Sequence, residues 1–366
     1  MATRAYIADR IFTGEEWLHF YAMIVEDGVI RQLLPVTCIP KDIEKEEFED
    51  CIIAPAFIDL QIYGAAGKLL SVYPDAEALI ALDQHCVKGG TAYCMPTVAT
   101  NNAEVVFRCI DAVKQYWNKG GKGILGLHLE GPWINPVKRG AHILELIHPP
   151  SMEEVKSLLA YGKGVIRMIT LAPEVCSVEV LDLLHAENVI ISAGHSNATY
   201  LQAIEGFDRG ITAVTHLYNA MSPLQHREPG LVGASMDHNK VMASIIPDGY
   251  HVDYPAIRIA KQTMQDRLYA ITDAVTDTSA GAYQHYAAGD KFESAGILSG
   301  SALTMQKALT NLVDHTGIDL EEALRMCSLY PAQVLRRDHE LGRIKKDFPA
   351  TAVILDAELG VRLVMR

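Results

Sequence analysis

Two histidines follow short apolar segments that have the same pattern. His195 comes directly after the segment 189–194, and His216 comes after the segment 213–215. The connector between them has about the length that a βα unit requires. Both imidazoles would then lie at the carboxyl ends of neighbouring parallel strands, where functional side chains collect when such strands close into a barrel. Histidine is a common metal ligand, so the pair indicates a metal site, although two unrelated polar residues at loop starts would give the same pattern.

Three carboxylates lie at the ends of other predicted strands: Asp59, Glu130 and Asp273. Two imidazoles and one carboxylate around a divalent ion, with a position left open for water, are typical of catalytic zinc sites. We therefore predict Glu130, His195 and His216 as metal ligands. Asp273 is the predicted general base, which accepts a proton from water and delivers it to the leaving amine. Glu130 could instead only cap a turn, and Asp273 could only cap the following segment.

Strand and helix patterns alternate through the middle of the chain. Helical patterns cover 75–88, 103–117 and 151–160, the last opening with Ser-Met-Glu-Glu, an N-cap signature. Continuous apolar strands separated by helices predict a parallel sheet buried on both faces, which is the (β/α)8 TIM-like barrel of the α/β class. A flat doubly wound sheet is the alternative, but the polar residues need a closed ring to converge. The eight predicted strands are 57–60, 91–95, 124–129, 166–171, 189–193, 213–215, 241–246 and 269–272.

Both ends of the chain are rich in short β patterns. Segments 4–12, 21–26, 29–34 and 47–53 are punctuated by turn residues, and Asp27-Gly28 is a hairpin signal. Segments 351–355 and 361–365 repeat the pattern near the C-terminus. Neither end has enough apolar surface to fold alone. We predict a small β-sandwich domain built from residues 1–53 and 335–366, with the barrel of residues 54–334 inserted into it.

Composition excludes several classes of protein. The 366 residues are 49% hydrophobic and 21% charged, which is ordinary for a globular protein. The formal net charge of −13 argues against nucleic acid or an anionic membrane as partner. The seven cysteines show no CxxC spacing, so neither a disulfide framework nor a thiolate zinc site is expected. Without an apolar leader or a bilayer-length apolar run, we expect a cytoplasmic protein.

Seven motifs are spread in order over nearly the whole chain. They are Pro-Ala-Phe-Ile-Asp-Leu at 55–60, His-Leu-Glu-Gly-Pro at 128–132, Ala-Gly-His-Ser at 193–196, Thr-His-Leu-Tyr-Asn-Ala-Met at 215–221, Pro-Gly-Leu-Val-Gly at 229–233, Asp-Gly-Tyr-His at 248–251 and Ile-Thr-Asp-Ala at 271–274. Together they resemble the amidohydrolase superfamily and, within it, the N-acetylglucosamine-6-phosphate deacetylase family. The resemblance implies a metal-dependent hydrolase of amino-sugar catabolism, which converts N-acetyl-D-glucosamine 6-phosphate to D-glucosamine 6-phosphate and acetate.

The sequence departs from the wider superfamily after the first barrel strand. Many members carry His-x-His there for a second metal ion, but this chain has Gln61-Ile62-Tyr63. Neither Gln61 nor Tyr63 is a good zinc ligand, so we expect one divalent ion per subunit, with zinc first and iron(II), manganese and cobalt left open. Asp59 would then be a structural or orienting residue.

The resemblance also implies the substrate-binding residues. His142 could donate to the developing oxyanion. Residues 298–300 resemble a loop that closes over the sugar, before a helix at 301–313. Arg227 lies in a polar loop, and in the resembling family this residue reaches the phosphate of the neighbouring subunit, which implies a homodimer; His226 receives no role. The full predicted set is Ala141, His142, Asn219, Ala220, Arg227, His251, Leu298, Ser299 and Gly300.

Two other functions remain open at this point. One keeps the fold and the metal but changes the substrate, as in an N-acyl-amino-acid deacylase or a cyclic amidase. The other is a catalytically silent barrel that serves as an interaction scaffold. The presence of Glu130, His195, His216 and Asp273 together argues against the silent barrel.

Overall fold

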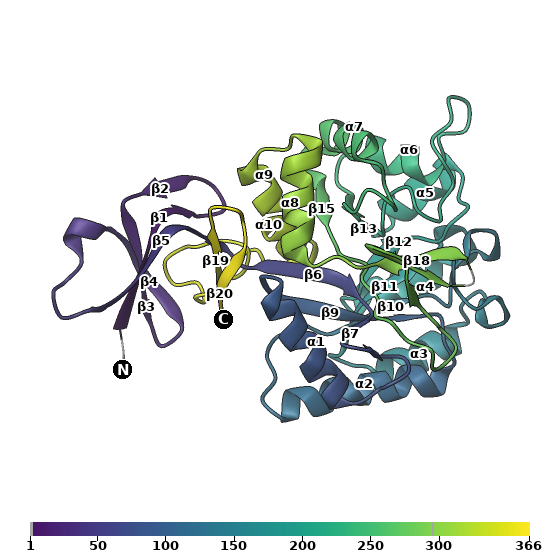
Figure 1. Cartoon of the computed structure of the whole chain (residues 1–366). Coiled ribbons are helices and arrows are strands. Elements are labelled where there is room, and N and C mark those ends of the chain that lie inside the picture. The colour runs from purple at the N-terminus through teal and green to yellow at the C-terminus, as the bar shows by residue number, and fades with distance from the viewer. Residues whose placement is uncertain (1–2, 295) are drawn as a thin grey trace. The chain divides into compact units, whose positions relative to one another are not determined.

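The computed structural model describes residues 3–294 and 296–366 (Figure 1). The chain forms two compact units. The first comprises Met1–Asp59, Cys86–Ala92 and Thr304–Arg366, and the second comprises Leu60–His85 and Tyr93–Leu303. The two chain ends therefore belong to one unit. The domain boundaries after residue 53 and before residue 335 remain predictions.

The chain ends together build a β-domain, as predicted, and its strands form one seven-stranded sheet. Its order is β20-β19-β5-β1-β3-β4, with β2 paired to β1. The hairpin between β3 and β4 turns at Asp27 and Gly28, whose φ angles are +50° and +76°, as a type I′ turn requires. The short strand β2 was not predicted. The strands are β1 (Thr3–Phe12), β2 (Trp17–His19), β3 (Tyr21–Glu26), β4 (Val29–Pro35), β5 (Glu44–Pro55), β19 (Ala352–Asp356) and β20 (Val361–Met365).

The alternating pattern of these strands buries apolar residues on both faces of the sheet. Met23 and Val25 of β3 belong to one core cluster, which also contains Ile354 of β19. Ala22 and Ile24, which point to the opposite face, belong to a second cluster. Strand β19 pairs antiparallel with β5, so the last strands of the chain complete a sheet that the first strands begin.

Eight strands in chain order form the predicted barrel sheet, and the pairs from β9 to β15 are parallel. The ring closes just beyond β15, where Ile62 and Ala274 form a parallel bridge and the Asp273 N–H donates to the Gln61 carbonyl at 2.9 Å. A closed ring, rather than a flat sheet, is therefore correct. The strands are β6 (Phe57–Ile62), β9 (Thr91–Ala99), β10 (Leu127–Glu130), β11 (Ile166–Leu171), β12 (Ile190–Ala193), β13 (Ala213–Val214), β14 (Met242–Ile245) and β15 (Leu268–Ala270).

Helices α2 to α7 lie around the outside of the barrel strands (Figure 1). The predicted cap at Ser151 is confirmed, because its hydroxyl accepts the Glu154 N–H at 3.2 Å at the start of α3. Within the described residues, no helix is both long and apolar enough to cross a membrane. The helices are α1 (Ala76–Lys88), α2 (Ala103–Asn118), α3 (Met152–Tyr161), α4 (Val178–Ala186), α5 (Tyr200–Asp208), α6 (Gly230–Asp237), α7 (Tyr254–Met264), α8 (Met305–Thr316), α9 (Leu320–Cys327) and α10 (Leu329–Val334).

Two small sheets complete the second unit. The hairpin of β7 (Gly64–Ala65) and β8 (Lys68–Leu69) follows the first barrel strand. The antiparallel sheet of β16 (Tyr286–Ala287), β17 (Lys291–Ser294) and β18 (Ile297–Ser301) follows the last. Residues 298–300 were predicted as a loop, but they lie in β18, because backbone pairing with β17 extends the chain there. The following helix consequently begins at Met305 rather than at Ser301.

Candidate active site

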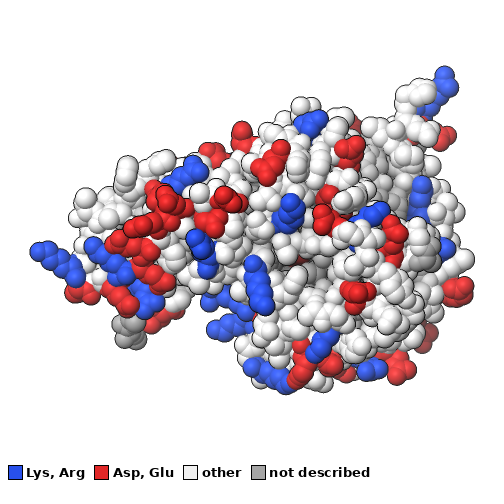
Figure 2. Space-filling model, in the orientation of Figure 1, with Lys and Arg blue, Asp and Glu red and all other residues white. Residues whose placement is uncertain are grey.

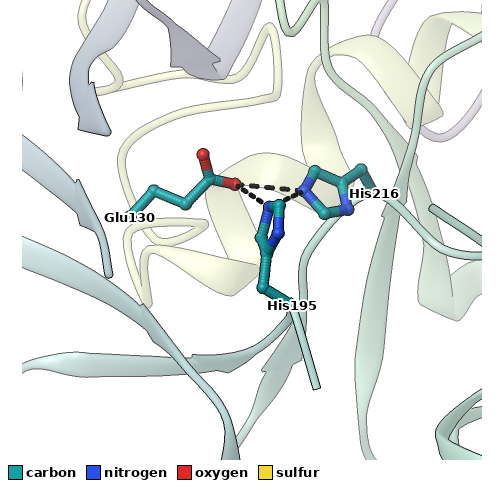
Figure 3. Close-up of side chains that lie close together, drawn as sticks. All are labelled: Glu130, His195 and His216. Atoms are coloured by element: carbon teal, nitrogen blue, oxygen red, sulfur yellow. Dashed lines mark hydrogen bonds and ion pairs between the residues drawn. The ribbon is translucent and has the colours of Figure 1, made fainter. Parts of the chain in front are cut away.

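The three predicted metal ligands converge at the carboxyl end of the barrel (Figure 3). Their facing atoms are Glu130 Oε1, His195 Nε2 and His216 Nε2. His216 Nε2 lies 3.0 Å from the carboxylate oxygen and 3.1 Å from His195 Nε2, and His195 Nε2 lies 3.3 Å from the same oxygen. All three side chains are buried.

The backbone adopts an uncommon conformation where it carries these residues. His195, His216 and Asp273 have φ angles of +46°, +38° and +53°. A non-glycine residue in this left-handed region costs about 1–3 kcal/mol, and such residues cluster at functional sites. In each case the chain leaves a barrel strand and turns sharply, and the side chain faces the barrel mouth.

Hydrogen bonding prepares His195 to be a ligand. Its Nδ1 lies 3.0 Å from the carbonyl oxygen of Lys138, which can only accept, so Nδ1 carries the ring proton. The lone pair of the neutral imidazole is then on Nε2, the atom that faces Glu130 and His216. A backbone carbonyl that fixes the ring in this way is typical of metal-ligating histidines.

The two oxygens of Glu130 have different surroundings. Oε2 accepts hydrogen bonds from the Tyr63 hydroxyl and from His142 Nε2, the latter at 3.2 Å, whereas Oε1 faces the two histidines. Burial alone would raise the pKa of this carboxyl, but the electrostatic interaction with His195 and the hydrogen bond from His142 hold the pKa well below its usual value. Burial raises the pKa of the Tyr63 phenol well above 10, so the hydroxyl stays a donor. Oε1 is therefore the oxygen that could bind a metal ion together with the two histidines.

Gln61 links Glu130, a predicted metal ligand, to the predicted general base. Its Nε2 lies 3.0 Å from Glu130 Oε1 and 2.7 Å from Asp273 Oδ1. Gln61 and Tyr63 were considered only as positions that had lost metal ligands, and their contacts with the two carboxylates were missed. The signal was available, because both occupy the places of the His-x-His pair. Asp59, which was predicted to end this strand, lies three residues before the end of β6 and does not line the cavity.

A cavity of about 210 Å³ contains almost the whole predicted site. Among the described residues that line it there is no lysine or arginine. Arg227 does not line this cavity and is exposed. The predicted residues in its wall are Glu130, Ala141, His142, His195, Asn219, His216, Ala220, His251, Asp273, Leu298, Ser299 and Gly300.

Two of the predicted substrate-binding histidines are held by neighbouring groups. His251 Nδ1 lies 2.5 Å from Asp248 Oδ2, and Asp248 Oδ1 accepts the His251 backbone N–H at 2.8 Å. The Thr100 backbone N–H donates to His142 Nδ1, so the His142 proton is on Nε2, which points to Glu130. Burial lowers the pKa of His142 to about 4, so its ring is neutral near pH 7. The predicted donation from His142 to an oxyanion remains a prediction.

The three facing atoms fit a divalent cation. Ligands about 2.0–2.1 Å from a tetrahedral ion lie about 3.3 Å from one another, close to the three separations found here. One carboxylate oxygen and two imidazole nitrogens form a donor set used by zinc and by other first-row divalent metals. Without a cation, two nitrogen lone pairs and a carboxylate oxygen would face each other in a buried space. This arrangement costs free energy, and a bound cation would remove that cost.

Tyr283 and His285 are among the further cavity residues that sequence reasoning missed. They lie in the segment between β15 and β16, which carries no motif that could have indicated them. The Tyr283 hydroxyl donates to the Thr100 carbonyl at 2.7 Å, which ties this segment to the end of β9.

Residues 52–363 match the amidohydrolase family, and residues 5–49 match the NagA composite domain. An N-acetylgalactosamine-6-phosphate deacetylase of Escherichia coli O157:H7 is 32% identical, over 99% of this chain and 97% of its own length. An N-acetylglucosamine-6-phosphate deacetylase of Haemophilus influenzae is also 32% identical, over 92% and 91%. The crystal structure of N-acetylglucosamine-6-phosphate deacetylase from Pasteurella multocida is 33% identical, with a TM-score of 0.93 over 98% of this chain and 97% of that one.

Proposed function

The chain belongs to the amidohydrolase family, and we propose that it hydrolyses the acetamide of N-acetyl-D-glucosamine 6-phosphate to D-glucosamine 6-phosphate and acetate. The observation that carries the proposal is the convergence of Glu130, His195 and His216 beside Asp273 in one cavity. These four residues are suited to amide hydrolysis, and the names of the relatives indicate which amide is the substrate. A silent scaffold would have no need of buried, strained residues at this point.

The residues divide the work of hydrolysis. A divalent ion held by Glu130, His195 and His216 would supply Lewis acidity toward the acetamide carbonyl and make water more acidic. Asp273 accepts the proton of the attacking water and returns it to the nitrogen as the carbon–nitrogen bond breaks. Gln61 donates to Asp273 Oδ1 and so keeps the carboxylate beside the ligands.

The phosphate of the substrate needs a positively charged partner, and the described residues of the cavity wall include no lysine or arginine. The net charge of −13 repels an anion, and acidic and basic side chains are interspersed on the face shown in Figure 2. Arg227 is exposed and lies in the loop that precedes α6. This loop extends outward from the barrel (Figure 1). We place this guanidinium on the phosphate in the neighbouring subunit of a homodimer, together with His251 of the chain that holds the substrate.

The finer assignments follow from the donor set. The site takes one ion, because Gln61 and Tyr63 stand where a second ion would need imidazoles, and zinc is the first choice for a buried Glu-His-His set. All seven cysteines are free thiols, which agrees with a reducing cytoplasm.

Metal analysis combined with acetate release tests the function. The purified protein is expected to contain about one divalent ion per chain and to release acetate from N-acetylglucosamine 6-phosphate, and chelation should abolish this activity. N-acetylglucosamine without phosphate, and an N-acetyl amino acid, are the comparison substrates. Equal turnover of the unphosphorylated sugar, or faster turnover of the amino acid, would reject the sugar phosphate as substrate.

A further inference from the structure

A buried histidine that the proposed chemistry does not use lines the cavity. His285 is only 4% exposed. Its Nδ1 lies 2.9 Å from the hydroxyl oxygen of Ser299 in β18. No contact joins it to the metal ligands or to Asp273 among the interactions of the described residues. Its place in the wall therefore calls for another explanation.

The ring of His285 is held in one orientation. Its backbone N–H and carbonyl pair with those of Thr278, each at 3.0 Å. The imidazole lies parallel to the Tyr283 ring, with an angle of 7° and 6.5 Å between the ring centroids. Tyr283 is in turn fixed to the Thr100 carbonyl and packs with Leu69 and Val275. A side chain positioned by this many neighbours is prepared to make a directional contact.

One nitrogen of this ring is available. Within the described part of the chain, Nε2 of His285 has no hydrogen-bond partner, and the ring forms part of the cavity wall. Burial lowers the pKa of His285 to about 4, so the imidazole is neutral near pH 7. A neutral imidazole beside a serine hydroxyl is suited to a substrate hydroxyl rather than to a phosphate, which prefers charged donors.

The substrate has hydroxyls to be recognised here. The acetamide must lie at Glu130, His195 and His216, and the phosphate must lie at the cationic group that binds it, so the ring hydroxyls face the remaining walls. The relatives divide between enzymes named for N-acetylglucosamine 6-phosphate and for N-acetylgalactosamine 6-phosphate, at equal identity to this chain. These two sugars differ only in the orientation of the hydroxyl at C4.

We propose that His285, oriented by Ser299, hydrogen-bonds the C4 hydroxyl of the hexosamine ring and determines which of the two epimers this enzyme prefers. The inference rests on the proposed function, because it needs a hexosamine 6-phosphate in the cavity. A buried polar group that loses its partner when the hydroxyl points elsewhere disfavours the wrong epimer.

The test compares the two epimers with the parent, His285→Phe and His285→Gln. The phenylalanine keeps an aromatic ring beside Tyr283 but removes both nitrogens, whereas glutamine keeps a polar group near the position of Nε2. We expect His285→Phe to change the ratio of the two kcat/KM values by about tenfold, mainly through KM of the preferred epimer. His285→Gln should keep the ratio within about threefold of the parent. Tyr286→Phe, at an exposed neighbour, is the matched control and should leave both values unchanged.

The outcomes separate the inference from the function. A parent that hydrolyses neither epimer overturns both. A parent that is active, with His285→Phe lowering both kcat/KM values by the same factor or leaving both unchanged, overturns the epimer assignment alone. If His285→Phe does not fold, Ser299→Ala decides, because it releases the ring without removing it. The proposal is supported if Ser299→Ala changes the ratio of the two kcat/KM values in the direction expected for His285→Phe, by a smaller factor. It is overturned if Ser299→Ala leaves this ratio unchanged.

Discussion

At the scale of single residues, the proposed role of Asp273 as the group that transfers the proton gives the first prediction. Asp273 lines the cavity and contacts Gln61. Asp273→Asn keeps the size of the side chain and leaves the three ligand atoms in place. Metal content should therefore stay at the parental value, while kcat falls about 100-fold or more. Metal analysis and steady-state kinetics on the same preparation check this. Asp314→Asn, at an exposed position on α8, is the control, and activity within tenfold of the parent would reject the role of Asp273.

Gln61 and Tyr63 give a second prediction at the same scale. Both side chains already contact Glu130, so imidazoles placed there would lie beside the first metal position. The double variant Gln61→His/Tyr63→His should raise the metal content from about one to about two ions per chain. Gln61→His alone should stay near one, because one imidazole is too few for a second site. A folded double variant that still binds a single ion would show that the ring geometry, and not these two residues, limits the metal number.

At the scale of elements, β18 must approach the end of the barrel closely. The Asp273 carbonyl accepts the Ser301 N–H at 3.1 Å, and the Val275 N–H donates to the Ser301 carbonyl at 3.2 Å. Gly300 has φ +146°, and a Cβ there would lie 2.6 Å from Val275 Cγ1 and 3.3 Å from the Asp273 carbonyl oxygen. Only glycine allows the strand to lie against the segment that carries Asp273.

Gly300→Ala should therefore harm both stability and activity. The steric contact is expected to cost about 1–3 kcal/mol of unfolding free energy and to lower kcat/KM. Gly289→Ala is the matched control, since Gly289 also has positive φ, at +70°, but no atom lies within 4 Å of the added Cβ. Denaturant unfolding and kinetics of the two variants separate backbone strain from crowding. Equal effects of both substitutions would contradict the account.

At the scale of the whole molecule, the proposed homodimer predicts that Arg227 binds the phosphate in the site of the neighbouring subunit. Arg227→Ala should raise KM for the sugar phosphate about tenfold or more, because a charge-assisted pair is lost. Mixing unfolded Arg227→Ala and Asp273→Asn chains and refolding them together tests whether Arg227 acts across the interface. Activity is measured at a substrate concentration well below the parental KM, where a tenfold higher KM leaves the Arg227→Ala chain with only about a tenth of the parental rate. Each mixed dimer would hold one site with Asp273 intact and an arginine supplied by the partner, so about a quarter of the parental activity should return. No recovery in verified mixed dimers would place Arg227 in its own subunit's site or outside catalysis.

The sequence alone determined the barrel, the sheet built from both chain ends and the set of polar residues at the strand ends. Each depends on local pattern: apolar runs predict strands, their alternation with helices predicts a parallel ring, and a polar residue after a strand lies at the mouth of that ring. His195 and His216 could be paired in this way because consecutive parallel strands are neighbours.

The tertiary structure alone decided the contacts between segments that are distant in sequence. Gln61 contacts Asp273 because the ring closes between the first and last strands. The register between these two segments cannot be predicted from the sequence of either one. His285 and Ser299 face each other because β18 pairs antiparallel with β17, where a loop was predicted. At the barrel mouth, the direction of a side chain depends on backbone angles such as the positive φ of Asp273. Tertiary packing imposes these angles against the local preference of the residue.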